Sequence, residues 1–320
     1  MTQRELGQTG IAITPLVFGG NVFGWTIDAQ TSFRILETFI DHGFDTIDTA
    51  DVYSRWVDGN QGGESETIIG RWLQANPGRR EKINLFTKVG SDMGIAGHKG
   101  LSKKWIIQAV EDSLRRLNTD YIDLYFSHWF DPQTPFQETL EAYQQLLQDG
   151  KIRAIGASNL TAEQLAESLD MAEQHQLPAY QVLQPEYNLY DRGSFAGALR
   201  DLCLEKNIGV VTYYSLASGF LTGKYHSQED LGKSKRGSGI SKYLNPRGVK
   251  IINALNDVAS QQQAKPVEVA LAWLIAREGV TAPIASATSS SQVESFAKAL
   301  TLTLTGEQIA QLEQVSQPEK

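Results

Sequence analysis

The feature that most constrains the fold of this chain is an alternation of short apolar runs with longer amphipathic stretches, repeated from one end of the sequence to the other. Short apolar runs bounded by turn residues are typical of buried strands. Strands that alternate with helices favour right-handed βαβ units and a parallel sheet, and eight such units close a barrel. The eight predicted strands are Val17–Gly20, Phe44–Ala50, Ile83–Val89, Tyr121–Trp129, Ile152–Asn159, Tyr180–Asn188, Ile208–Leu216 and Thr281–Thr288.

The predicted fold class is therefore α/β, as a (β/α)8 TIM barrel. Because no linker rich in Pro, Gly or Ser divides the sequence, we expect residues 1–320 to form a single barrel domain. An open, doubly wound sheet is the alternative, since it also alternates strands with helices.

Two of the predicted helices carry clear signals at their start. Ser102 is a suitable N-cap for a helix that runs to Leu117, in which the apolar residues fall on one face and charged residues on the other. Thr161 and Gln164 form a capping-box pattern directly after the strand that ends at Asn159. Both patterns predict junctions between a strand and a helix.

Three segments exceed what a minimal barrel needs. Residues Thr2 to Thr14 alternate around a glycine-bearing turn, which predicts a β-hairpin that plugs one end of the barrel. The polar, basic span from Lys224 to Gly248 is expected to be a long functional loop after the seventh strand. Residues Val249 to Ala276 have enough helical pattern for two helices, of which one is additional.

Composition and charge disfavour nucleic-acid binding, membrane insertion and metal binding. A formal net charge of −8 disfavours nucleic acid as a partner, and no apolar run is long enough to insert in a membrane. The single cysteine, Cys203, and a first segment without a secretory signal indicate the cytoplasm. The five histidines and this cysteine lack metal-ligand spacing, so we expect no metal. The sequence gives no indication of oligomeric state.

Reactive side chains gather at the expected carboxyl ends of three consecutive strands, where the active site of a parallel barrel forms. These are Asp48 and Tyr53, then Lys88, then His128. Taken singly, each has a structural explanation, such as a turn cap, a solvated strand end or a core imidazole. Their convergence favours delivery of a proton to a carbonyl oxygen.

An electrostatic argument assigns a role to each of the four. Free tyrosine has a pKa of about 10, so a nearby Lys88 ammonium is expected to lower the pKa of Tyr53 and make it a better acid. Asp48 would hold Lys88 charged and in place. His128 would donate a hydrogen bond to the substrate oxygen and orient the carbonyl toward Tyr53.

Five segments that occur in order along the chain resemble the aldo-keto reductase family. They are Gly43–Tyr53, Phe86–Lys88, Asp123–Trp129, Ile155–Asn159 and Gly219–Tyr225. The resemblance covers essentially the whole chain. It implies an enzyme, an NADP(H)-dependent oxidoreductase that reduces aldehydes or ketones to alcohols. Hydride would come from the nicotinamide ring and the proton from Tyr53, within a catalytic tetrad of Asp48, Tyr53, Lys88 and His128.

The resemblance also implies a set of residues that bind NADP(H). A Ser-Asn pair and a glutamine would hold the nicotinamide amide, an aromatic ring would stack on the nicotinamide, and the next loop would cover the pyrophosphate. The implied cofactor-binding residues are Gly20, Asn21, Asp48, Ser158, Asn159, Gln184, Tyr213, Ser215, Leu216, Ser218, Gly219, Lys224, Arg236, Ser286, Thr288, Gln292 and Ser295. The lack of a Gly-x-Gly-x-x-Gly fingerprint agrees with a barrel that binds its dinucleotide without a Rossmann unit.

Two departures from the family pattern leave alternatives open. Tyr214 stands where relatives have the serine of a Tyr-Ser-Pro-Leu sequence, and residues 285–295 lack the Lys and Arg that commonly bind the 2′-phosphate. NAD(H) therefore remains an alternative to NADP(H), although Arg236 and a helix N-terminus are suitable phosphate partners. Lys224 and Arg236 are equally compatible with solvated loop charges.

Two other functions fit the same residues. One is a barrel lyase in which Lys88 forms a Schiff base. The other is a cofactor-sensing subunit that binds NADP(H) and regulates a membrane channel, as some members of the resembling family do. For the enzyme, we expect a small-molecule carbonyl substrate that enters an apolar, aromatic-lined mouth. Candidate residues for this mouth are Trp25, Trp56, Trp129 and Phe130.

Overall fold

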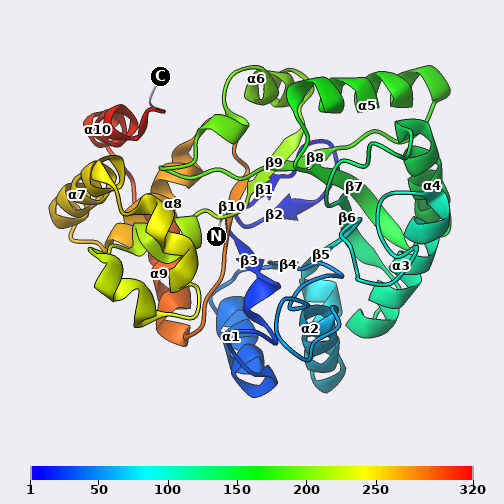
Figure 1. Ribbon diagram of the computed structural model, residues 1–320, viewed down its shortest axis with the longest axis horizontal. Coiled ribbons are helices and arrows are strands. Elements are labelled where there is room, and N and C mark those ends of the chain that lie inside the picture. The colour runs from blue at the N-terminus through cyan, green and yellow to red at the C-terminus, as the bar shows by residue number, and fades with distance from the viewer. Residues whose placement is uncertain (1, 319–320) are drawn as a thin grey trace.

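The computed structural model describes residues 2–318, which form a closed barrel of eight parallel strands surrounded by helices (Figure 1). The last barrel strand pairs with the first, so the TIM-barrel prediction is confirmed and the open doubly wound sheet is excluded. Each predicted apolar run contains one strand. The barrel strands are β3 (Val17–Gly19), β4 (Thr46–Asp48), β5 (Asn84–Val89), β6 (Ile122–Ser127), β7 (Ile152–Ser158), β8 (Val182–Gln184), β9 (Gly209–Thr212) and β10 (Ala282–Ala285).

Several strands end earlier than their apolar runs predict. The run Tyr180–Asn188 contributes only Val182–Gln184 to the sheet, because Pro185 follows and has no N–H to donate. Strand β9 ends at Thr212; beyond it, Tyr213 makes only an isolated bridge to Glu186, and Tyr214 belongs to the following turn. The apolar residues after these strands therefore line the carboxyl end of the barrel instead of extending the sheet.

Helices connect successive strands and pack around the barrel. The capping predictions are confirmed, since the Ser102 side chain accepts from the Trp105 N–H and Thr161 forms a capping box with Gln164. Within residues 2–318, no helix combines the length and the apolar character needed to cross a bilayer. The helices are α1 (Ala29–Asp41), α2 (Glu64–Ala75), α3 (Lys103–Leu117), α4 (Phe136–Gln148), α5 (Ala162–His175), α6 (Ala198–Glu205), α7 (Pro246–Gln261), α8 (Pro266–Ala276), α9 (Ser290–Thr301) and α10 (Gly306–Ser316).

Two of these helices are additions to the repeating βα pattern. Helix α7 precedes α8 between β9 and β10, as the sequence predicts, and α10 follows α9 at the end of the chain. They contact each other at the edge of the molecule, away from the strands (Figure 1). The carboxyl-terminal part of the chain is therefore secured by packing against the segment that follows β9.

A hairpin closes the amino end of the barrel, as predicted. Its strands β1 (Arg4–Glu5) and β2 (Ala12–Ile13) are antiparallel. Leu6 and Ile13 are fully buried in the core inside the barrel, together with Phe86 and Phe126. A separate, larger apolar core lies between the strands and the surrounding helices. The active site must therefore open at the carboxyl end, since side chains fill the other end.

The segment after β9 differs from the long loop predicted for residues 224–248. It contains two 3-10 helices, η5 (Gln228–Lys233) and η6 (Gly237–Tyr243), and α7 already begins at Pro246. Buried Tyr243 stacks on Phe220, which anchors a segment whose composition is otherwise polar. Four further 3-10 helices occur in the connections: η1 (Gly20–Val22), η2 (Arg80–Lys82), η3 (Gly193–Phe195) and η4 (Ala217–Thr222).

Candidate active site

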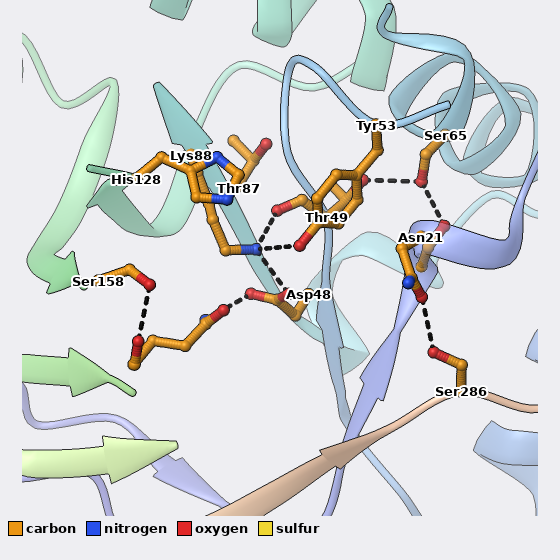
Figure 2. Close-up of polar contacts among 12 residues, drawn as sticks. Asn21, Asp48, Thr49, Tyr53, Ser65, Thr87, Lys88, His128, Ser158 and Ser286 are labelled. Carbon is orange, nitrogen blue, oxygen red and sulfur yellow. Dashed lines mark hydrogen bonds and ion pairs between the residues drawn. The ribbon is translucent and has the colours of Figure 1, made fainter. Parts of the chain in front are cut away.

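Lys88 lies at the centre of a buried polar cluster at the carboxyl end of the barrel (Figure 2). Its Nζ donates to Asp48 Oδ2 at 2.6 Å, to the Thr49 carbonyl at 2.7 Å and to Tyr53 Oη at 3.0 Å. Asp48 ends β4 and Lys88 lies on β5, the adjacent strand. Parallel pairing of neighbouring strands thus brings together the ammonium, carboxylate and phenol that the sequence singled out.

The loop that carries Tyr53 is held in place by local hydrogen bonds. Ser54 has a left-handed φ of 73°, and its hydroxyl donates to the Phe23 carbonyl at 2.6 Å. Thr49 contacts the Ser65 hydroxyl at 2.8 Å, and Ser65 donates to the Gly20 carbonyl at 2.7 Å (Figure 2). These contacts fix the chain on both sides of Tyr53 and set the direction of its ring.

The pKa of Tyr53 moves opposite to the sequence prediction. Burial raises it above the ordinary value of 10.0, and the opposing effect of the Lys88 charge is smaller. The prediction of a lowered pKa was wrong because it considered the ammonium without the loss of solvation. Tyr53 therefore keeps its proton at neutral pH.

The charge on Lys88 is maintained by its partners. Burial alone lowers the pKa of an amine, but Asp48 and Tyr53 outweigh it and raise the pKa of Lys88 above 10.5. Burial also raises the pKa of Asp48, against the hydrogen bonds that Lys88 and Gln184 donate to its carboxylate. Since Gln184 Nε2 lies 2.9 Å from Asp48 Oδ1, both carboxylate oxygens have a donor.

His128 follows β6 and faces the same cluster. Its ring centroid lies 6.0 Å from that of Tyr53, and its backbone N–H donates to the Val89 carbonyl at 2.8 Å. Burial, assisted by the Lys88 charge, lowers the pKa of His128 well below 6.5. The imidazole is therefore neutral at neutral pH, with one N–H available as a donor.

A cavity of about 750 Å³ opens over these residues. Tyr53, Asp48 and His128 line it, whereas Lys88 has no exposed surface and lies behind them. Gly20 also lies outside the lining: it is buried, and a Cβ there would be 3.1 Å from the Asp48 carbonyl. The other expected cofactor contacts do line the cavity: Asn21, Ser158, Asn159, Gln184, Tyr213, Ser215, Leu216, Ser218, Gly219, Lys224, Arg236, Ser286, Thr288, Gln292 and Ser295.

Amide and hydroxyl groups lie on the cavity wall beside the tetrad. Asn159 Nδ2 donates to the His128 carbonyl at 3.0 Å, and Tyr213 Oη donates to Asn159 Oδ1 at 2.7 Å. The Ser158 hydroxyl donates to the Gln184 carbonyl at 2.7 Å (Figure 2). This set of donors and acceptors is chemically suited to a carboxamide such as that of nicotinamide.

Positive charge lies at another part of the same cavity. Lys224 and Arg236 come from the segment after β9, and Lys265 precedes α8. The sequence analysis missed Lys265, whose Nζ lies 3.4 Å from Ser295 Oγ. No local pattern identifies it, because these two residues are 30 positions apart and meet only through the packing of α8 on α9. The cations and hydroxyls here fit a phosphate.

Aromatic side chains surround the cavity, but not all those expected. Trp56, Trp129 and Tyr214 line it and are about half exposed. Trp25 lies against Trp56, with 5.4 Å between ring centroids, but does not itself line the cavity. Phe130 packs on Phe136 instead. Of the four residues expected at the mouth, Trp56 and Trp129 thus line the cavity, whereas Trp25 and Phe130 do not.

The described residues contain no group of three or more His, Cys, Asp or Glu side chains placed to hold a metal ion. The one cysteine, Cys203, is a buried free thiol.

A closed parallel barrel with an ion-paired lysine, a tyrosine and a histidine at its carboxyl end is the arrangement expected of a barrel oxidoreductase that acts on carbonyl groups. The sequence pattern of the Aldo/keto reductase family matches residues 15–317, and the chain belongs to this family. Its members typically use a nicotinamide cofactor.

Several characterised and uncharacterised proteins resemble the chain over nearly its full length. It is 33% identical to the uncharacterized oxidoreductase YrpG of Bacillus subtilis, over 98% of this chain and 96% of that protein. It is 30% identical to the L-glyceraldehyde 3-phosphate reductase of Escherichia coli O157:H7, over 98% and 92%. A probable voltage-gated potassium channel subunit beta of Arabidopsis thaliana is 31% identical, over 94% and 91%.

Proposed function

We propose that this protein reduces the carbonyl group of a small aldehyde or ketone to an alcohol, with NADPH as hydride donor and Tyr53 as general acid. The observation that carries the proposal is the contact of Tyr53 Oη with the Lys88 ammonium, 3.0 Å away, at the wall of the cavity. A protonated phenol supported by a buried cation is a suitable proton donor to a carbonyl oxygen.

Each member of the tetrad has a separate task in this reaction. NADPH, when bound, supplies the hydride that adds to the carbonyl carbon. Tyr53 gives its proton to the carbonyl oxygen, and the Lys88 ammonium stabilises the phenolate that remains. Asp48 keeps Lys88 charged through the 2.6 Å ion pair. Neutral His128 donates to the same carbonyl oxygen and orients it toward Tyr53.

The cavity wall supplies groups for each part of NADP(H). Ser158, Asn159 and Gln184 would hold the carboxamide, Tyr213 would stack on the ring, and residues 215–219 would cover the pyrophosphate. For the 2′-phosphate, we propose Lys265 together with the hydroxyls of Ser286, Thr288, Ser291 and Ser295, and Gln292 beside them. Lys224 and Arg236 add charge from the segment after β9. This cluster favours NADP(H) over NAD(H) as the cofactor.

The substitution Tyr53→Phe tests the proposal. It removes the proton donor but keeps the ring, so we expect NADPH to bind normally while reduction falls by roughly 10²- to 10⁴-fold. Steady-state consumption of NADPH with a panel of aldehydes measures the loss. Tyr121→Phe is the matched control, because this ring packs between Arg80 and Arg153 outside the cavity. Turnover in the Tyr53 variant equal to that of the control would reject Tyr53 as the acid.

The lyase alternative is not favoured by the position of Lys88. A Schiff-base lysine must reach the substrate carbonyl carbon, but Lys88 is 0% exposed and all three of its N–H groups have acceptors. Tyr53 and Asp48, rather than Lys88, line the cavity. A substrate would have to displace this ion pair before any amine could attack it.

A second candidate function is that of a cofactor-sensing subunit of a membrane channel. Two plant relatives carry the name probable voltage-gated potassium channel subunit beta, at 31% and 30% identity. An intact tetrad is compatible with both roles. Tight NADPH binding without turnover of any aldehyde in the panel would favour the channel subunit.

For the enzyme, we propose a cytoplasmic location, in keeping with the free thiol of Cys203.

A further inference from the structure

A chain of hydrogen bonds reaches His128 from the mouth of the cavity. Trp129 Nε1 donates to Ser91 Oγ at 3.0 Å, and Ser91 Oγ lies 3.1 Å from His128 Nδ1. The Trp129 and His128 rings stack, with centroids 5.5 Å apart and an angle of 14° between their planes. Ser91 follows β5, lines the cavity beside His128 and Trp129, and is 8% exposed.

The direction of each hydrogen bond in this chain follows from which groups can donate a proton and which can accept one. An indole N–H only donates, so the Ser91 oxygen is the acceptor in its contact with Trp129. The Ser91 hydroxyl then has its own proton to place, and among the described residues its other partner is His128 Nδ1. If Nδ1 carried a proton, the Ser91 hydroxyl would lack an acceptor among the described residues, at a position that is 8% exposed.

We infer that Ser91 is a positioning residue that holds His128 in the tautomer with its proton on Nε2. The Nε2 atom makes no hydrogen bond to the described residues, and His128 lines the cavity, so the N–H left free is the one available to a ligand. The backbone of His128 is fixed independently, since its N–H donates to Val89 and its carbonyl accepts from Asn159. The remaining freedom of the imidazole is its tautomer and ring rotation, and Ser91 restricts both.

The tautomer is a property of the free protein, whereas its role in orienting a carbonyl rests on the proposed function. Trp129 is 49% exposed and lines the cavity, so the chain connects a residue at the mouth with the donor at the reacting centre. Under the proposed function, Ser91 and Trp129, which lie outside the tetrad, therefore also help to position the substrate.

Nuclear magnetic resonance on protein labelled with ¹⁵N-histidine tests the tautomer directly. The sequence has five histidines, and the signals lost in His128→Gln identify those of His128. We expect the wild-type protein, without cofactor or substrate, to show a non-protonated Nδ1 and a protonated Nε2 at neutral pH. In Ser91→Ala we expect a mixture of both tautomers, and Ser91→Thr, which keeps a hydroxyl, should restore the Nε2 form.

The same variants have a kinetic signature. With 4-nitrobenzaldehyde as the probe substrate, Ser91→Ala should lower kcat by about tenfold, the effect of one neutral hydrogen bond lost in the transition state. NADPH affinity should change little, because Ser91, although it lines the cavity, is not among the residues proposed to bind NADP(H). Trp129→Phe keeps the stacked ring but removes the donor, so we expect its tautomer to lie between those of the wild type and Ser91→Ala.

Two results would overturn the inference: a proton on Nδ1 of His128 in the wild type, or an unchanged Nε2 tautomer in Ser91→Ala. A loss of kcat in Ser91→Ala without a change of tautomer falls under the second. Failure of the proposed function is seen separately, as absence of NADPH-dependent turnover in the wild type. The tautomer measurement needs no turnover and is decided independently of that outcome.

Discussion

At the scale of single residues, the site depends on contacts that offset the desolvation of one buried ammonium, that of Lys88. Lys88 has no exposed surface, and desolvation alone lowers the pKa of its amine. Asp48 and Tyr53 reverse this effect through contacts of 2.6 Å and 3.0 Å. Removal of the Asp48 carboxylate would leave an unpaired buried charge, at a cost of about 3–5 kcal/mol. Both partners of the ion pair therefore matter for the stability of the protein as well as for the chemistry proposed here.

Cofactor preference is also decided by single residues. Lys265→Met should weaken NADPH binding by about tenfold, the effect of one lost charge-assisted contact at a partly exposed site. NADH binding should not change, because NADH lacks the 2′-phosphate. Quenching of tryptophan fluorescence measures both dissociation constants. Lys298→Met is the matched control, since Lys298 is exposed on α9 and does not line the cavity. An equal effect of Lys265→Met on both cofactors would contradict this assignment.

The four tetrad residues could be predicted from the sequence, but Ser91 and Lys265 could not. Asp48, Lys88 and His128 lie at or beside strand ends, and parallel pairing brings neighbouring strand ends together. Ser91 and Lys265 contact side chains from other elements, and no spacing in the sequence encodes those contacts. The pKa of Tyr53 was mispredicted for a related reason, because the extent of burial is known only from the packed structure.

At the scale of secondary-structure elements, the backbone of the hairpin approaches the barrel closely at its turn. Gly7 has a φ of +58°, and a Cβ there would lie 2.4 Å from the Gly209 nitrogen and 2.6 Å from the Gln181 carbonyl oxygen. Gly10, in the same turn, has a φ of +70° with nothing within 4 Å of an added Cβ. The two glycines thus have similar backbone strain but different surroundings.

Gly7→Ala should therefore destabilise the protein more than Gly10→Ala. Both variants carry the cost of alanine in the left-handed region, and Gly7→Ala adds a steric clash worth about 1–3 kcal/mol. Urea denaturation followed by circular dichroism gives the two free energies of unfolding. If the two values were equal, the close approach of Gly7 to β9 would not contribute to stability. Reduction of aldehydes by the folded variants should be unaffected, because the hairpin is at the opposite end of the barrel.

The sequence predicts regular elements better than irregular ones. Helices α3 and α5 were predicted with their capping residues because Ser102 and Thr161 act through neighbours three positions away. In contrast, η5 and η6 were predicted as loop. Their turns are too short for a hydrophobic period, and their support comes from distant contacts such as the hydrogen bond of Tyr243 to Asp191.

At the scale of the whole molecule, the first residues are bound to the last part of the barrel. Arg4 donates to the carbonyls of Ile275, Val280 and Thr281, and β3 pairs with β10. Near the site, the Ser286 hydroxyl donates to Asn21 Oδ1 at 2.8 Å across the same seam (Figure 2). These contacts close the barrel between segments that are far apart in sequence.

The single-domain organisation of residues 1–320 remains a prediction, and calorimetry tests it. We expect one cooperative unfolding transition, because breaking the seam opens the entire sheet. NADPH at about 100 times its dissociation constant should shift this transition upward as a unit, by the equivalent of about 2.7 kcal/mol. Two transitions, of which NADPH moves only one, would show that the chain unfolds as separate domains.

The complete burial of Lys88 has a consequence for the durability of the protein. An enzyme that handles aldehydes continually meets compounds that condense with free amines, and reducing sugars do the same slowly to surface lysines. Loss of the Lys88 amine would disable the proposed reaction, and Lys88 has no exposed surface at which such adducts could begin. Under the proposed function, burial of Lys88 would therefore shield the amine of the tetrad from glycation and from carbonyl substrates, and exposed lysines such as Lys250 would be expected to react first.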